Sequence, residues 1–300
     1  MKLLLAHYNV TRQAHGNDKK RRKRRARLRT VYIGLIAQCR EIHPQMGLRK
    51  MYNQLKPEGI GRDAFIILGM QEGFRLAAPV NYRRTTYASI YQAYDNLLVD
   101  KVVTSINQVW VSDLFYLEME DYHLYIVLIM DLFSRRIVGS AGGDHMRADL
   151  FTKAMNRALS LRGVDDYDDQ LIHHSDRGSQ YTSQAYTELL GAHGIEISMC
   201  ANVLENAHAE RVNGTIKNDY LRHYDSVRPS TIDSRTLKAQ DAYNDRYHDS
   251  LGCTPMLFET KIDDLSPAEH RKYDIHVFTM ENTQKVNIPG QLSLFEMFNS

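Results

Sequence analysis

The sequence lacks long apolar runs and has few cysteines. Its longest apolar run, residues 124–130 of 300, is far shorter than the roughly 20 residues of a membrane-spanning helix. At the N-terminus the apolar residues precede the positive charges, which is the reverse of a signal peptide. The three cysteines, Cys39, Cys200 and Cys253, form no CxxC pair, which argues against a cysteine-based zinc site. These absences predict a reduced, cytoplasmic protein with no membrane contact.

Net charge is also small, at +2, but it is distributed unevenly. Residues 1–30 contain eleven Lys and Arg and one acid, Asp18, so they carry +10 and the other 270 residues carry −8. Such a block attracts phosphate and favours a nucleic-acid arm, with a membrane surface or a solvated helix face as alternatives. The arm residues predicted to contact DNA are Lys19, Lys20, Arg21, Arg22, Lys23, Arg24 and Arg25.

Apolar residues at helical spacing, interrupted by Pro and Gly, predict short helices after this arm. We expect a helix-turn-helix domain over residues 31–78, with Arg62 at the start of its last helix among the DNA contacts. A three-helix bundle without a ligand is the alternative. A linker over residues 79–104 would follow.

The next segment predicts a mixed α/β domain over residues 105–260. Strands are expected at 108–118, 123–131, 136–140, 171–175 and 195–199, and helices at 146–161, 183–193, 205–221 and 236–247. A C-terminal extension, residues 261–300, completes the chain.

Three carboxylates stand out in this domain. Asp113 shares the apolar face of its strand, Asp176 ends a strand, and Glu210 lies within a helix. Each alone has an ordinary explanation: an Asp paired with a buried Arg, a turn Asp, and a solvated Glu. Together they could bind two Mg²⁺ or Mn²⁺ ions and support in-line phosphoryl displacement.

Four motifs around these residues resemble the DDE transposases of bacterial insertion sequences, with the IS-three family as the best match. They are Trp110-Val-Ser-Asp113, Asp131-Leu-Phe-Ser-Arg-Arg-Ile-Val-Gly139, His174-Ser-Asp-Arg-Gly-Ser-Gln-Tyr-Thr-Ser183 and Asn206-Ala-His-Ala-Glu210. The resemblance covers roughly residues 20–260. In one departure, 33 residues separate Asp176 from Glu210, slightly fewer than is usual in the family.

The resemblance implies an α/β fold with an RNase H-like, integrase-type core and mixed sheet, preceded by a small all-α helix-turn-helix domain. It implies that Asp113, Asp176 and Glu210 are the catalytic metal ligands, with two Mg²⁺ or Mn²⁺ ions when DNA is bound. It also implies that Lys217 contacts DNA near the element end, and that Asp131 is structural rather than the first catalytic Asp.

The implied activity is metal-dependent DNA cleavage and strand transfer at the ends of an insertion sequence. The implied partners are the terminal inverted repeats, target DNA, further copies of this chain, and the product of an upstream reading frame. The expected location is the cytoplasm, in association with the bacterial nucleoid. An RNase H-like nuclease that cuts without joining, and a non-catalytic DNA-binding regulator, are the alternatives.

The C-terminal residues suggest one further partner. Gln291-Leu292-Ser293-Leu294-Phe295 follows Pro289-Gly290, which breaks any preceding element. The segment resembles the peptide by which bacterial replication proteins dock on the β sliding clamp. In that interpretation Gln291, Leu292, Leu294 and Phe295 make the contacts; otherwise these residues fold back onto the protein's own core.

Overall fold

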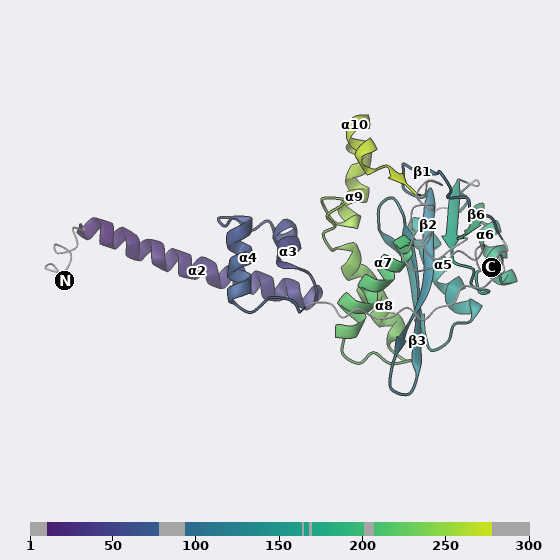
Figure 1. The fold of residues 1–300 in the computed structure, drawn as a ribbon, viewed down its shortest axis with the longest axis horizontal. Coiled ribbons are helices and arrows are strands. Elements are labelled where there is room, and N and C mark those ends of the chain that lie inside the picture. The colour runs from purple at the N-terminus through teal and green to yellow at the C-terminus, as the bar shows by residue number, and fades with distance from the viewer. Residues whose placement is uncertain (1–10, 78–93, 164, 168–169, 201–206, 278–300) are drawn as a thin grey trace, which may run out of the picture. The chain divides into compact units, whose positions relative to one another are not determined.

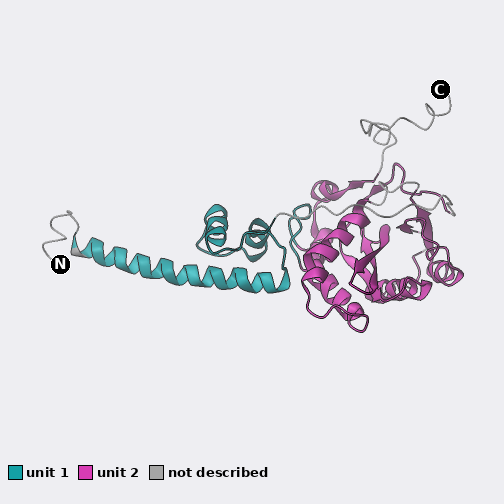
Figure 2. Cartoon of the chain, turned by 60° about the horizontal axis from the view of Figure 1, so that its bottom comes forward, with its two compact units in different colours: residues 1–82, 246–253 teal, residues 83–245, 254–300 magenta. Residues whose placement is uncertain are grey.

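The computed structural model describes residues 11–77, 94–163, 165–167, 170–200 and 207–277. The chain divides into two compact units (Figure 2). Met1–Tyr82 and Arg246–Cys253 form the helical unit, and Arg83–Asp245 and Thr254–Ser300 form the core unit. Over the described residues, no helix combines the length and apolar character needed to cross a membrane.

The helical unit is built on α2 (Arg12–Ile42), α3 (Leu48–Leu55) and α4 (Arg62–Gln71) (Figure 1). On α2, Tyr32, Ile36 and Cys39 recur at helical spacing and are all buried. The three helices share one apolar core, whose buried members are Tyr32, Ile36, Cys39, Met46, Leu48, Met51 and Phe65.

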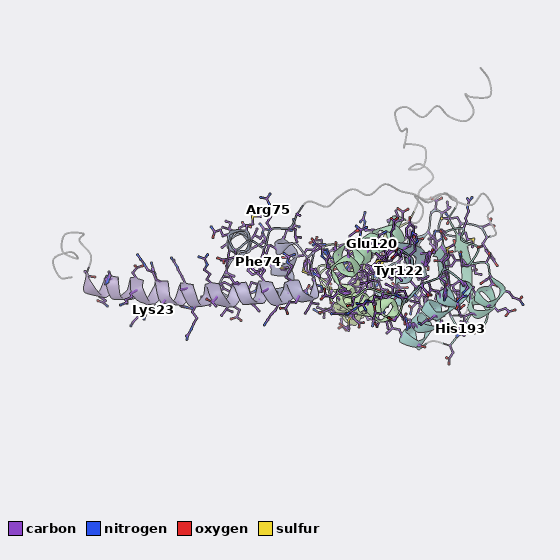
Figure 3. The ribbon with its side chains drawn as sticks, turned by 90° about the horizontal axis from the view of Figure 1, so that it is seen from below. Lys23, Phe74, Arg75, Glu120, Tyr122 and His193 are labelled. Atoms are coloured by element: carbon purple, nitrogen blue, oxygen red, sulfur yellow. The ribbon has the colours of Figure 1, made fainter. Side chains whose placement is uncertain are left out.

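The boundary expected at residue 30, between the arm and the helix-turn-helix, is not a break in the structure. Helix α2 runs through it, because the Lys, Arg, Ala and Leu residues here are good helix formers and no proline interrupts them. Residues 19–25 are exposed, and Figure 3 shows Lys23 among the side chains that project from α2. The basic arm is therefore a helix continuous with the core of its unit.

The expected catalytic segment 105–260 is interrupted. Arg246–Cys253 clusters with the helical unit. The backbone N–H of Tyr247 donates to Gln54 Oε1 at 2.9 Å, and Lys50 Nζ lies 3.6 Å from Asp249 Oδ2. These polar contacts explain why the loop belongs to the helical unit.

The expected linker 79–104 is also shorter than predicted. Residues 78–93 lie outside the described part, but residues 94–104 pack into the core unit. Leu98 is buried there, and the Leu97 N–H donates to Ser198 Oγ at 2.9 Å. The backbone N–H of Met199 donates to the carbonyl of Asp95 at 3.2 Å. These bonds extend the edge of the core unit, which the apolar pattern alone does not reveal.

A mixed five-stranded sheet forms the centre of the core unit, in the order β4-β3-β2-β5-β6. Its antiparallel half is β2, β3 and β4, and its parallel half adds β5 and β6 to β2. The bounds are β2 Val109–Glu118, β3 His123–Asp131, β4 Ile137–Gly143, β5 Leu171–Ser175 and β6 Ile195–Met199. A second, two-stranded sheet pairs β1 (Val102–Val103) with β7 (Ile275–His276).

Helices lie on both faces of the large sheet (Figure 1). They are α5 (Ala148–Arg162), α6 (Gln184–Gly191), α7 (Ala207–Thr215) and α8 (Ile232–Asn244). Two short helices follow, α9 (Pro255–Lys261) and α10 (Pro267–His270). The helix expected over 205–221 is α-helical only to Thr215, then continues as a π-helical turn, Ile216–Tyr220, and a 3₁₀ turn, Leu221–His223. The helix expected over 236–247 begins earlier and ends at Asn244.

Two glycines of β4 show how closely these helices approach. A Cβ at Gly139 would lie 2.3 Å from the carbonyl oxygen of Ala154 on α5, and one at Gly142 would lie 2.8 Å from Thr236 Oγ1 on α8. Because side chains alternate along a strand, these two positions face opposite sides of the sheet. Helices α5 and α8 therefore pack directly against opposite faces of β4.

Gly139→Ala should destabilise the core unit by about 2–3 kcal/mol, because the added methyl group overlaps the backbone of α5. Thermal unfolding followed by circular dichroism measures this loss. Gly191→Ala is the matched control, since a Cβ there meets nothing within 4 Å at the end of α6. Equal unfolding temperatures for Gly139→Ala and wild type would contradict the close packing.

Candidate active site

The pairing of β2 with β5 places two of the three carboxylates at the same level of the sheet. These strands are parallel, with Val111 opposite His174. Asp113 follows Val111 by two residues, and Asp176 follows His174 by two residues, just beyond the end of β5. Since both strands rise by the same amount per residue, the two aspartates lie at the same level, Asp113 in the middle of β2 and Asp176 just beyond the end of β5.

The third carboxylate is on α7, which packs against β2 and β3. Asn213, one helical turn after Glu210, donates from Nδ2 to Asp113 Oδ2 at 2.9 Å. Asn213 is 6% exposed, and its Oδ1 is buried without a hydrogen-bond partner among the described residues. This bond attaches the helix that carries Glu210 to the strand that carries Asp113.

The negative charges of Asp176 and Glu210 both act on Asp113. Burial, followed by the charges of Asp176 and Glu210, raises the pKa of Asp113 to about 8. Burial also raises the pKa of Asp176, although the Gly178 N–H donates to its Oδ1 at 3.0 Å. A cation among these carboxylates would relieve the repulsion that the protein itself leaves uncompensated.

The chemistry of this donor set suits Mg²⁺ or Mn²⁺, because half-buried carboxylate oxygens are the ligands that hard cations prefer. Within the described residues, however, no three His, Cys, Asp or Glu side chains are grouped so that they could hold a metal ion. The side chains therefore fit the ion by chemistry and by their shared charge, without forming a closed ligand cage.

A buried aromatic cluster supports the two aspartates from the other face of the sheet. Tyr181 is 1% exposed, and its hydroxyl lies 2.8 Å from Ser112 Oγ, next to Asp113. Its ring packs edge-on against Phe151 of α5, with ring centres 4.8 Å apart. Tyr181 thereby connects the loop that follows Asp176 to strand β2.

Asp131 belongs to a separate network at the end of β3. It is fully buried and accepts hydrogen bonds from the backbone N–H groups of Asn107 at 2.7 Å and Ser134 at 2.9 Å. Arg162 lies 3.4 Å away and is shared with Glu259. These contacts fit the structural role that we expected for Asp131.

The residues expected to bind DNA are divided between the two units: residues 19–25 and Arg62 are in the helical unit and Lys217 is in the core unit. Lys217 lies in the π-helical turn, where its Nζ donates to the carbonyl of Tyr116 at 2.7 Å and lies 5.2 Å from the centre of the Tyr116 ring. Arg62 is exposed on α4 and paired with its neighbour Asp63. Along the exposed arm, Arg22 pairs with Asp18 at 2.7 Å. Residues 291–295 lie outside the described part of the chain.

A surface groove of about 880 Å³ occurs elsewhere on the core unit, between α5 and α8. Lys153, Arg157 and Gln240 are among its lining residues, and none of the three carboxylates lines it. The groove is therefore not part of the candidate site.

Sequence reasoning identified the carboxylates but missed Asn213 and the role of Tyr181. Asn213 is three residues after Glu210, so helical spacing could have placed both on one side of α7. Tyr181 stands within the motif that carries Asp176, but nothing in the sequence reveals that its hydroxyl reaches Ser112 on another strand.

Comparison with known proteins gives matches to one group. The profile described as an integrase core domain matches residues 104–202. The transposase for insertion sequence element IS629 of Shigella sonnei is 30% identical over 221 residues, covering 72% of this chain and 73% of that protein. The uncharacterized 31 kDa protein of insertion element IS600, also from Shigella sonnei, is 35% identical over 184 residues. That match covers 59% of this chain and 66% of the relative.

The chain thus spans about two thirds of the length of the curated relatives that it matches. Among solved structures, the HTLV-2 integrase catalytic core domain in complex with magnesium (trimeric form) aligns at 22% identity with a TM-score of 0.42. The alignment covers 51% of this chain and 95% of that chain. The profile match and the mixed five-stranded sheet confirm the expected RNase H-like α/β fold.

Asp113→Asn should stabilise the metal-free protein at alkaline pH. The raised pKa means that wild type loses stability as pH rises from about 4 to about 8, while the neutral variant does not. Between pH 5 and pH 9 the difference in unfolding free energy should grow by roughly 2–4 kcal/mol in favour of the variant. Denaturant unfolding in the presence of a chelator measures it.

Asp233→Asn is the control for this experiment. Burial opposes the ionisation of Asp233, but hydrogen bonds from Arg157 and Lys153 hold its pKa well below the usual range. Its substitution should therefore destabilise the protein at every pH in the window. Parallel pH profiles for Asp113→Asn and wild type would refute the charge crowding at Asp113.

Proposed function

This chain belongs to the insertion-sequence transposases with an integrase core domain, and on that basis we propose that it cuts and joins DNA at the ends of an insertion sequence. In this proposal Asp113, Asp176 and Glu210 are the catalytic carboxylates. They bind Mg²⁺ or Mn²⁺, with two ions present when DNA is bound. Terminal inverted repeats are the substrate, and target DNA receives the cut ends.

The observation that carries the proposal is the level placement of Asp113 and Asp176 on neighbouring parallel strands, together with the charge of Glu210, which acts on Asp113. Asp131, a structural acid elsewhere in the core unit, is paired with Arg162. Asp113 instead has a pKa that is raised by burial and by neighbouring negative charge, and acids perturbed in this way are typical of functional sites.

A bound divalent cation would polarise the scissile phosphodiester and strengthen the attacking water or DNA 3′-hydroxyl. The chain's own residues have a positioning role. Asn213 orients the Asp113 carboxylate through its amide N–H, and the Gly178 N–H orients Asp176. On the other face of the sheet, the contact between Ser112 and Tyr181 connects the strand that carries Asp113 to the loop that follows Asp176. Little covalent chemistry is then required of the protein, since positioning and charge lower the barrier.

Three sets of basic residues would bind the DNA. Residues 19–25 present exposed charge around α2, and Arg62 begins α4, the last helix of the expected helix-turn-helix. Lys217 donates to the carbonyl of Tyr116, which is three residues after Asp113 on β2. From there Lys217 would contact DNA near the element end. All three would bind phosphates, which position the duplex without reading its sequence.

We also propose three protein partners. Further copies of this chain would pair the two element ends, and an upstream-frame product would join or assist it. The β sliding clamp would bind the 291–295 segment at the nucleoid, with Gln291, Leu292, Leu294 and Phe295 as contacts.

Asp176→Asn and Glu210→Gln should each reduce Mg²⁺-dependent cleavage of an element-end duplex by about 100-fold or more, because each removes a ligand charge. Binding to the same duplex in chelator should be unchanged. Glu196→Gln, at an exposed position on β6, is the control and should retain activity. An active Asp176→Asn protein would refute the triad, and cleavage without joining in wild type would favour the nuclease alternative.

Replacing Lys and Arg at residues 19–25 by Gln should weaken DNA binding and flatten its dependence on salt. Gln preserves the helix, so the loss reports charge alone. Because only one side of a helix can face the duplex, we expect the logarithmic salt slope to fall by roughly three. Arg→Lys at residues 21, 22, 24 and 25 preserves charge and should keep the slope. An unchanged slope for the Gln variant would mean that the arm does not contact phosphate.

A further inference from the structure

Two consecutive arginines between β3 and β4 have very different surroundings. Arg136 forms an ion pair with Glu259, with Nη1 2.5 Å from Oε2. Arg135 forms no ion pair with any acid of the described residues, and its guanidinium donates instead to a histidine, His208 Nδ1, at 2.8 Å. Arg136 is thus neutralised by an acid, whereas Arg135 is half-buried beside His208, which carries no negative charge.

The bond between Arg135 and His208 fixes the chemistry of the histidine. A guanidinium can only donate, so His208 Nδ1 must be the nitrogen without a proton. The proton of the neutral ring is then on Nε2, which makes the remaining nitrogen a donor. His208 and Arg135 therefore present N–H groups and no free acceptor.

A second guanidinium lies close by. Arg211 is exposed on α7, one turn along from His208, and burial together with the charge of Arg211 lowers the pKa of Arg135. Among acids, Asp131 is the one whose charge acts on Arg135, and it is already bonded to backbone N–H groups and to Arg162. Within the residues that the structure describes, the positive charge of the pair therefore has no counter-ion of its own.

The backbone of Arg135 is also unusual. Its φ of 61° is in the left-handed region, which costs a residue with a side chain roughly 1–2 kcal/mol and which glycine adopts freely. The presence of arginine rather than glycine at this position indicates a function for the guanidinium group. The turn conformation is compatible with the contact that its guanidinium makes with α7.

We propose that Arg135, His208 and Arg211 form a binding site for a backbone phosphate of DNA. The three donors would surround the phosphate oxygens, and the negative charge of the phosphate would neutralise the two guanidinium groups. His208 and Arg211 are on α7, so the site shares a helix with Glu210. The choice of DNA as ligand rests on the proposed function.

The test measures DNA binding separately from catalysis. Full-length protein is titrated onto a fluorescent element-end duplex in chelator, as wild type and as Arg135→Gln/Arg211→Gln. We expect the double variant to bind about tenfold more weakly at 0.1 M salt, with a salt slope lower by about one. Arg136→Gln is the matched control: it should lower the unfolding temperature by breaking the Glu259 ion pair but leave affinity and slope unchanged.

A set of duplexes that each carry one neutral methylphosphonate locates the contact. One such position should weaken wild type several-fold yet have no further effect on the double variant. The proposal is overturned if the double variant keeps the wild-type affinity and slope, if Arg136→Gln loses as much affinity, or if every methylphosphonate affects both proteins equally. Failure of wild type to bind any duplex would instead refute the proposed function.

Discussion

The parallel pairing of β2 with β5 is the constraint on which the site depends. It sets Val111 opposite His174, so the chain reaches Asp113 on one strand and Asp176 beyond the other at the same height. Two carboxylates held this way in a half-buried place repel each other, and Glu210 adds to the repulsion. The sheet pairing prevents the two aspartates from moving apart. Hydrogen bonds from Asn213 and from the Gly178 N–H then fix the orientation of each carboxylate.

The distribution of compensated and uncompensated charge follows the same logic across the core unit. Asp131, Glu259 and Arg162 neutralise one another at the end of β3, and Asp233 is neutralised by Arg157 between α5 and α8. The pKa of Asp113 is instead raised by burial and by the charges of Asp176 and Glu210, and Arg135 donates to His208 rather than to an acid of the described residues. In the proposed function, a DNA phosphate would bring negative oxygens to Arg135, and divalent cations would bring positive charge to the acids.

The sequence predicted most of the fold because each strand has a strong local signature. The expected strands 123–131, 171–175 and 195–199 match β3, β5 and β6 residue for residue. β3 is a buried apolar run, and β6 alternates apolar Ile195, Ile197 and Met199 with polar residues. The helix ends were less predictable: the change to a π-helix at Ile216 and the early start of α8 at Ile232 depend on tertiary packing. Of the site, the carboxylates were visible in motifs, whereas Asn213 and Arg135 acquire meaning only through partners about a hundred and about seventy residues away.

The continuity of α2 has a metric consequence. An α-helix rises about 1.5 Å per residue, so the 31 residues of α2 extend about 46 Å as one rod. Its basic stretch is held at a fixed distance and rotation from Tyr32 and Ile36, which are anchored in the helical unit. A flexible tail of equal charge would sample many phosphates at many spacings. If the arm binds DNA as proposed, a rigid rod would fix the distance between the phosphates that the arm contacts and the DNA that the rest of the helical unit contacts.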